Sequence, residues 1–96
     1  MEVGVHLGYQ NLRGESDMEF FRRETQIMVE AEAMGFDFAA CVEHHFTDYA
    51  ACPDPIQTLS YVAAKTSTIK LMPAAVILPW NDPLRVVEKM AMLDSL

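Results

Sequence analysis

The segment Phe38-Ala-Ala-Cys-Val-Glu-His-His-Phe46 decides how this sequence is interpreted, because an apolar run passes directly into three titratable side chains. Residues 38–42 have the length and composition of a buried strand, and Glu43, His44 and His45 follow it without a break. In β/α proteins the carboxyl end of a strand is where catalytic and ligand-binding groups are usually mounted. The segment therefore predicts a functional site at the end of a strand.

Two further strand-like runs lie on either side of this segment in the sequence. Residues 3–7 are short and mostly apolar, as expected for a strand covered on both faces. Residues 69–78 form a longer apolar run with Pro73 in its middle. A proline removes one donor from the hydrogen-bond ladder, so we expect a bulge or an abrupt end of the strand there.

A helix is predicted between the first two strands. Ser16 and Glu19 have the spacing of a capping box, in which each residue satisfies an orphan N–H group of the first helical turn. The helix should run over residues 17–34, and Gly35 suits the left-handed position that ends it. Its expected buried face consists of Phe20, Ile27, Ala31 and Met34.

The pairs Asp54-Pro55 and Asp82-Pro83 predict the starts of two more helices. In each pair the aspartate caps the helix, and the proline occupies the first helical position, where its missing N–H costs nothing. The first of these helices should end near Lys65. The expected buried residues are Ile56, Leu59 and Ala63 in the second helix, and Leu84, Val87 and Ala91, widened by Val86 and Met90, in the third.

The predicted order is therefore β-α-β-α-β-α, which implies a parallel sheet with right-handed crossovers. Such a sheet has two unpaired outer strands, and native proteins normally cover or blunt such edges. We therefore interpret residues 1–96 as a partial domain, the N-terminal part of a longer α/β protein.

Composition excludes some classes of function. The net charge of −7 argues against nucleic acid as a partner, because binding phosphates needs a basic face. The sequence has no apolar run of about 18 residues that would span a membrane, and no signal-peptide pattern at its start. Cys41 and Cys52 are best interpreted as reduced thiols of a cytoplasmic protein.

The three titratable residues cannot all act on one atom. In an extended segment Glu43 and His45 point one way and His44 the other. A contiguous Glu-His-His is also a poor metal-binding pattern, since ligands usually follow helix or strand periodicity, so we expect no metal. One histidine, with an ordinary pKa of about 6.5, would suit a general base or a hydrogen-bond donor. A solvated strand end with ordinary hydrogen bonds remains the alternative.

A second candidate site is the pair Ala74-Ala75, which follows Pro73. Small side chains at a strand end would let a flat ligand approach the backbone, although the spacing alone favours close packing against a helix as the explanation. His6 lies inside an apolar strand and is expected to be a satisfied core histidine. Tyr9 and Trp80 are expected in the core or at its rim.

An ordered set of short motifs resembles the N-terminal third of the bacterial luciferase-like flavin monooxygenases, close to their alkanal monooxygenase branch. The resemblance covers essentially all 96 residues. The matching residues are Gly35-Phe-Asp37, Val42-Glu-His-His-Phe46, Leu78-Pro79, Asp82-Pro83, Glu88 and Leu93-Asp94.

The resemblance implies a (β/α)8 TIM barrel of which this chain supplies the first three β-α units. It implies reduced FMN delivered by a separate flavin reductase, and O2 adding to the flavin to give a C4a-hydroperoxide. That species would oxygenate an aldehyde or a similar small organic substrate. A homo- or heterodimer is also implied, as is a phosphate-binding set beyond residue 96, so the fragment alone should be inactive.

The resemblance also assigns roles to single residues. His44 matches the catalytic base, and Ala74-Ala75 matches the small pair whose non-proline cis peptide backs the flavin ring, a bond that costs roughly 3–4 kcal/mol. Glu43 and His45 match positions that support the site and the subunit interface. Met72-Pro73 departs from the family pattern of Gly followed by Thr or Ser, and this puts the orientation of the flavin in question.

Two alternatives remain open at this point. The chain could be a non-catalytic luciferase-like companion subunit that has lost its own flavin site. It could also belong to an oxidoreductase that uses the deazaflavin F420 on the same fold.

Overall fold

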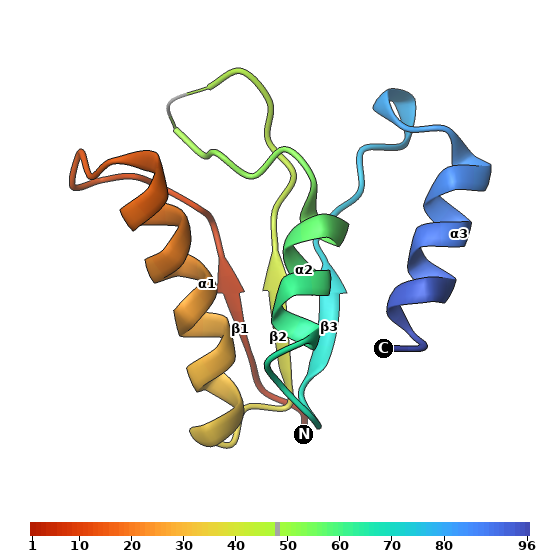
Figure 1. Ribbon diagram of the computed structural model, residues 1–96, viewed down its shortest axis with the longest axis horizontal. Coiled ribbons are helices and arrows are strands. Elements are labelled where there is room, and N and C mark those ends of the chain that lie inside the picture. Colours follow the sequence, from red (N-terminus) through yellow and green to blue (C-terminus); the bar gives the residue numbers. More distant parts are fainter. Residues whose placement is uncertain (48) are drawn as a thin grey trace.

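In the computed structural model, which describes residues 1–47 and 49–96, three parallel strands alternate with three α-helices (Figure 1). The strands pair in the order β1-β2-β3, so the predicted β-α-β-α-β-α order is confirmed. The elements are β1 (Gly4–Leu7), α1 (Asp17–Ala33), β2 (Phe38–Cys41), α2 (Pro55–Ala63), β3 (Lys70–Pro73), the 3-10 turn η1 (Leu78–Trp80) and α3 (Pro83–Leu93).

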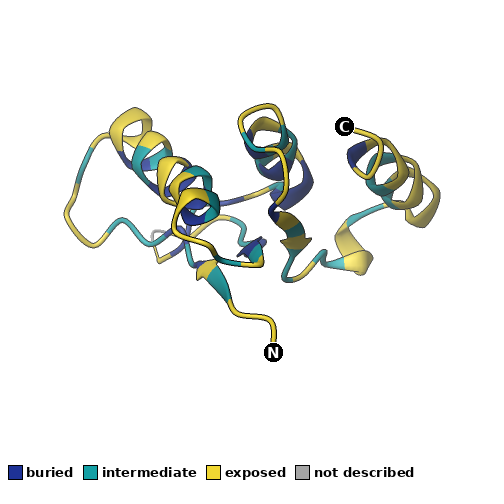
Figure 2. Cartoon of the chain, turned by 90° about the horizontal axis from the view of Figure 1, so that it is seen from below, coloured by how far each residue is buried: buried dark blue, intermediate teal, exposed yellow. Residues whose placement is uncertain are grey.

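The sheet is covered on one face. Figure 2 shows α1, α2 and α3 on the same side of the strands. Leu7, Ala39 and Cys41 point into the core on that side, and the alternation of a strand sends their neighbours to the other. His6, Ala40 and Met72 lie opposite one another across the three strands on this open face.

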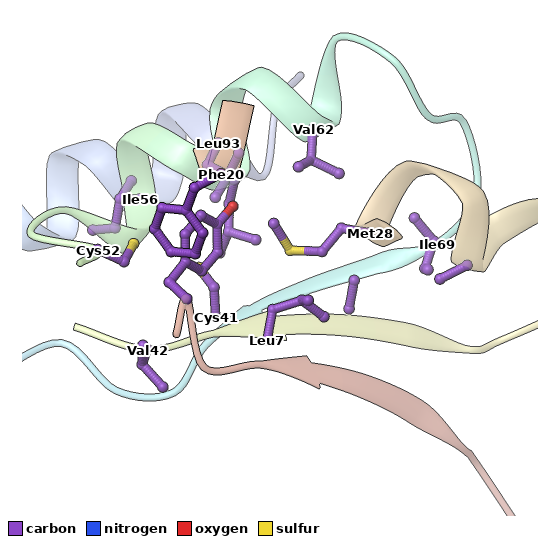
Figure 3. Packing of buried hydrophobic residues seen from close by; sticks show 14 residues of the cluster. Leu7, Phe20, Met28, Cys41, Val42, Cys52, Ile56, Val62, Ile69 and Leu93 are labelled. Atoms are coloured by element: carbon purple, nitrogen blue, oxygen red, sulfur yellow. The ribbon is translucent and has the colours of Figure 1, made fainter. Parts of the chain in front are cut away.

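The core lies between the sheet and the helices (Figure 3). Tyr9 and Phe20 are fully buried there, and their rings meet edge to face at 6.0 Å. The Tyr9 hydroxyl shares a hydrogen bond of 3.0 Å with the Thr25 hydroxyl, so the one polar atom of the ring is satisfied in the core. Tyr9 is therefore a core residue, as expected, whereas Trp80 is 60% exposed and lies at the rim.

Both predicted ends of α1 are confirmed. The Ser16 hydroxyl and the Glu19 carboxylate form the capping box. At the other end Gly35 has a φ of 84°, its N–H donates to the Glu32 carbonyl, and the Phe36 N–H donates to the Ala31 carbonyl. This is the Schellman arrangement, which requires a left-handed residue and explains the glycine.

The buried face of α1 differs from the prediction. Phe20 and Ala31 are buried, but Ile27 and Met34 are exposed by 38% and 70%. Met28, which is fully buried, lies closer to the centre of the face that contacts the sheet. The buried stripe of α1 is rotated relative to the prediction because Glu24 and Thr25 also face inward. Glu24 pairs there with Arg23, and the Thr25 hydroxyl donates to the Phe21 carbonyl.

The face of α3 that contacts the core was predicted only in part. Val86 and Met90 pack against the core, as expected, together with Leu93, but Leu84, Val87 and Ala91 are exposed. Both stripes are apolar, so the hydrophobic periodicity alone does not decide which one is buried. The Lys89 ammonium lies 2.9 Å from the Asp54 carboxylate at the start of α2, which is consistent with the neighbouring Met90 turning inward.

The structures of α2 and β3 differ less from the predictions. In α2 the buried residues are Ile56, Leu59 and Val62, while Ala63 is only half-buried. The third strand ends abruptly at Pro73, as one of the two expected outcomes at the proline. Across residues 1–47 and 49–96, no helix combines the length and apolar character needed to cross a membrane.

Glu32 near the end of α1 fixes the connection between α2 and β3. Its carboxylate accepts hydrogen bonds from the N–H groups of Ser67, Thr68 and Ile69, at 2.8, 2.5 and 3.0 Å. These backbone hydrogen bonds favour the charged form and lower the pKa of Glu32 from 4.5 to about 2. The start of β3 is therefore anchored to α1 by a single carboxylate.

Candidate active site

The carboxyl ends of β2 and β3 come together at one edge of the sheet. The Ala74 N–H donates to the Cys41 carbonyl at 2.8 Å, so the pairing of the two strands continues one residue past β3. This contact places Glu43, His44 and the Ala74–Ala75 pair on neighbouring strand ends, as the sequence predicts for a parallel sheet.

Glu43 joins the end of β2 to the segment that follows β3. Its side chain is almost fully buried and accepts the Ile77 N–H at 2.7 Å and the Asn81 Nδ2 at 3.2 Å. A third contact, at 2.7 Å, comes from His45 Nε2. Three donors around one buried carboxylate form a rigid clamp, because losing any of them would leave a buried charge undersatisfied.

His45 is held between this carboxylate and an aromatic ring. Its imidazole stacks on Trp80 with ring centroids 4.6 Å apart and planes 22° apart. A carboxylate oxygen can only accept, so Nε2 of His45 donates to Glu43. The contacts of Glu43 and His45 thus hold η1 against the end of β2.

His44 points elsewhere, as the strand alternation predicts. Its backbone N–H donates to the Cys52 carbonyl at 2.8 Å, which fixes the main chain at this position. The half-buried ring lies edge-on to Tyr49, with centroids 6.3 Å apart. No hydrogen bond to another described residue engages the His44 ring nitrogens.

Ala74 and Ala75 do not pack in the core. Ala74 is half-buried and Ala75 is exposed, and the peptide bond between them is cis. The core-packing explanation of the two small side chains is therefore wrong. The exposed Ala75 leaves part of this backbone accessible beside the end of β2.

Two observations bear on other chemistry at this edge. In the described part of the chain, no three His, Cys, Asp or Glu side chains gather in a way that could hold a metal ion. Cys41 and Cys52 are free, buried thiols. Their mutual hydrogen bond and their burial raise the pKa of Cys41.

The sequence over residues 1–96 matches the profile of the luciferase-like monooxygenases. The chain belongs to this family. It is 30% identical, over 81 residues, to the alkanal monooxygenase alpha chain of Photorhabdus laumondii.

Solved structures of monooxygenases superpose closely on this chain. The monooxygenase RslO1 from Streptomyces bottropensis superposes with a TM-score of 0.90 at 31% identity, over 99% of this chain and 30% of that protein. The oxygenating constituent of 3,6-diketocamphane monooxygenase from Pseudomonas putida, solved in complex with FMN, gives 0.90 at 25% identity, over 99% of this chain and 26% of that one. The three β-α units are thus those of a luciferase-like TIM barrel.

The chain is much shorter than its luciferase-like relatives. The match to the Photorhabdus protein covers 84% of this chain but only 23% of that protein. The chain therefore spans about a quarter of the length of the curated relatives it matches. In the family's barrel, further strands lie beside β1 and β3 and enclose the face that is open here.

Several contacts of this candidate site were not predicted from the sequence. Ile77, Asn81 and Trp80 complete the surroundings of Glu43 and His45, and the Cys52 carbonyl fixes His44. None of them carries a local signal, because each acts through its backbone or through a partner far away in the sequence.

Proposed function

We propose that this chain is the N-terminal part of a flavin-dependent monooxygenase. In this proposal the complete enzyme uses reduced FMN and O2 to oxygenate an aldehyde or a similar small organic substrate, and His44 is its general base. The observation that carries the proposal is the difference in hydrogen bonding among the three titratable residues at the end of β2. Glu43 and His45 are bound to neighbouring residues, whereas the His44 ring has no hydrogen-bond partner among the described residues.

The residues at the strand ends fit a flavin ring. Ala75 is exposed and Ala74 half-buried, so a planar ring system could lie against them without a steric conflict with larger side chains. When bound, reduced FMN supplied by a separate reductase would provide the activation of O2. His44 would hold or move a proton at a ring nitrogen, and the Glu43 clamp would keep the strand ends in register.

The complete protein in this proposal is larger than the chain. Residues 1–96 would form the first part of one barrel domain, and the full barrel would associate as a homo- or heterodimer. The 96-residue chain alone would be inactive, because three β-α units leave two sheet edges open and enclose no dry cavity around a reacting flavin.

The test is replacement of His44 in the full-length protein. His44→Ala should lower turnover on the order of 100-fold or more, as loss of a general base does, while FMN binding changes little. Added imidazole should restore part of the activity, because it can enter the space that the ring leaves. Turnover equal to that of the unchanged enzyme would reject the role assigned to His44.

A non-catalytic companion subunit is the second candidate. It is favoured by Met72, whose side chain is 44% exposed on the open face, directly before the strand end that would support the flavin. Purification with a second barrel chain, together with absence of flavin binding by this one, would decide for it. Spectral titrations with FMN and with F420 would separate the two cofactors.

A further inference from the structure

Two thiols lie together in the core next to the candidate site (Figure 3). Cys41 is the last residue of β2, Cys52 lies two residues before the cap of α2, and both side chains are fully buried. The two free thiols form a hydrogen bond with each other. They lie between the middle strand of the sheet and the helix that follows it, so their contact does not depend on either edge of the sheet.

The two thiols differ in their surroundings. The Cys41 thiol donates to the Pro55 carbonyl at 3.7 Å, whereas the Cys52 sulfur lies 3.5 Å from the Thr58 hydroxyl. The hydrogen bond from Cys41 lowers the pKa of Cys52 below that of an ordinary thiol, and the Thr58 hydroxyl acts in the same direction. Because the thiolate is the nucleophile, Cys52 is the attacking thiol of the pair and Cys41 the resolving one.

A cavity on the helical side of the molecule leads toward Cys52. It has a volume of about 560 Å³ and lies between α1, α2 and the segment before α2. Pro53, Asp54 and Thr58 are among the residues that line it. Thr58 therefore contacts both the buried sulfur of Cys52 and the cavity from which a small neutral oxidant would approach.

The backbone of the same two cysteines supports the candidate site. The Cys52 carbonyl accepts the His44 N–H, and the Cys41 carbonyl accepts the Ala74 N–H, each at 2.8 Å. A covalent bond between the two sulfur atoms is shorter than the hydrogen bond that it replaces, so the end of β2 and the segment before α2 would move toward each other. Both backbone hydrogen bonds would be displaced with them, and a displacement of about 1 Å at a site can cost about 100-fold in rate.

We propose that Cys41 and Cys52 form a redox switch that lowers the activity of the enzyme when hydrogen peroxide oxidises it. The Cys52 thiolate attacks one oxygen of H2O2, the O–O bond breaks, and a sulfenic acid and a hydroxide ion form. The Cys41 thiol then attacks the sulfenic sulfur, and its proton leaves with the sulfenic hydroxyl group as water. In total, two thiols and one H2O2 give one disulfide and two molecules of water.

The thiol chemistry does not need a flavin, but its effect on turnover rests on the proposed function. Reduced flavin that reacts with O2 without oxygenating a substrate gives oxidised flavin and H2O2, so the proposed enzyme would itself supply the oxidant. Disulfides that form in reducing compartments are usually transient and serve catalysis or redox sensing. The switch therefore needs no oxidising compartment.

The experiment uses the full-length protein, first reduced and then treated with H2O2. Peptide mapping by mass spectrometry measures the cross-link between Cys41 and Cys52, and hydrogen exchange of the segment around His44 measures the loss of its bond to the Cys52 carbonyl. The variants are Cys41→Ala, Cys52→Ala and the matched pair Thr58→Val and Thr66→Val. Each valine replaces a hydroxyl that donates to a carbonyl four residues earlier, but only the Thr58 hydroxyl lies within hydrogen-bond distance of Cys52.

In the unchanged protein, H2O2 should produce the cross-link, lower turnover about tenfold or more, and speed the exchange of the His44 segment. Dithiothreitol should reverse all three effects. Cys41→Ala should accumulate a dimedone-reactive sulfenic acid at Cys52, whereas Cys52→Ala should form neither a cross-link nor a sulfenic acid. Thr58→Val should slow the cross-linking several-fold, and Thr66→Val should leave its rate unchanged.

The measurements on the unchanged protein need no substitution, so they do not depend on the folding of any variant. Absence of the Cys41–Cys52 cross-link after treatment with H2O2 would overturn the switch, and so would a cross-link that leaves turnover or the exchange of the His44 segment unaltered. A cross-link with faster exchange, in a protein that oxygenates no aldehyde with reduced FMN, would support the thiol chemistry and count against the proposed function.

Discussion

At the scale of single residues, the geometry of the candidate site depends on Glu43. Its carboxylate gathers a backbone N–H, a side-chain amide and an imidazole from two separate segments. A buried carboxylate with three donors is far better satisfied than any neutral replacement of the same shape. His44 gains its orientation indirectly, since the clamp fixes the backbone on one side of it and the Cys52 carbonyl on the other.

Glu43→Gln should therefore destabilise the protein by about 1–3 kcal/mol, because the amide keeps one acceptor oxygen and turns an NH2 group toward one of the two donors, the Ile77 N–H or the Asn81 amide, which then lacks its acceptor. Urea denaturation of the full-length protein measures the change. Glu30→Gln is the matched control, since the exposed Glu30 carboxylate accepts a hydrogen bond from the Gln26 amide and from no other described residue, and it should shift stability by less than about 0.5 kcal/mol. Equal stability of the two variants would contradict the clamp.

The orientation of residues 43–45 could be predicted from the sequence, but their distant partners could not. Strand alternation predicted that Glu43 and His45 would share one side and His44 the other, and their contacts agree. The partners of Glu43 lie 34 and 38 positions away, and no local pattern pairs such residues. The roles of Glu43, His44 and His45 in catalysis stay predictions.

At the scale of elements, the ends of the helices were more predictable than their buried faces. Capping residues act on their own first turn, so Ser16, Asp54 and Asp82 predicted the starts of α1, α2 and α3. Which apolar stripe turns inward is decided by neighbouring elements. The rotation of α1 toward Met28, and the exposure of Leu84, Val87 and Ala91 in α3, therefore needed the packed structure.

Glu32 gives an element-scale prediction for the dependence of stability on pH. Its pKa is about 2 in the folded chain against an ordinary 4.5, so the unfolded chain binds more protons between these values. The stabilisation from Glu32 is complete above about pH 4.5 and is lost as pH falls toward 2. Urea midpoints from pH 5 to 3 should fall less steeply in Glu32→Gln than in the unchanged protein.

The control for the pH series is again Glu30→Gln, on the same helix. Glu30 accepts only a side-chain amide, so its removal should leave the pH dependence of the urea midpoint as it was. If Glu32→Gln also keeps the full slope, the loop between α2 and β3 is not anchored by the ionised carboxylate.

At the scale of the whole molecule, the alternation of elements predicted the parallel sheet, and the family likeness identifies it as part of a TIM barrel. The sheet has helices on one face only, and His6 and Met72 are exposed on the other. Sequence reasoning placed His6 in the core because it treated β1 as covered on both sides, which these three strands alone do not achieve.

The isolated chain of residues 1–96 should show no FMN-dependent oxygenation, because its open sheet face encloses no site from which water is excluded. Oxygen consumption with reduced FMN and an aldehyde, compared between this chain and the full-length protein, is the measurement. Oxygenation above the rate of free reduced flavin would show that three β-α units suffice.

The Glu43 clamp also has a consequence for the order in which the site forms during synthesis. The ribosome releases the end of β2 well before Asn81, so the Glu43 carboxylate first emerges without two of its three donors, the Ile77 N–H and the Asn81 amide. The clamp closes after β3 has added to the sheet and the chain has turned through η1. Because this step waits for a contact that is distant in sequence, a nascent chain that stalls before residue 81 would carry His44 beside an incomplete Glu43 clamp.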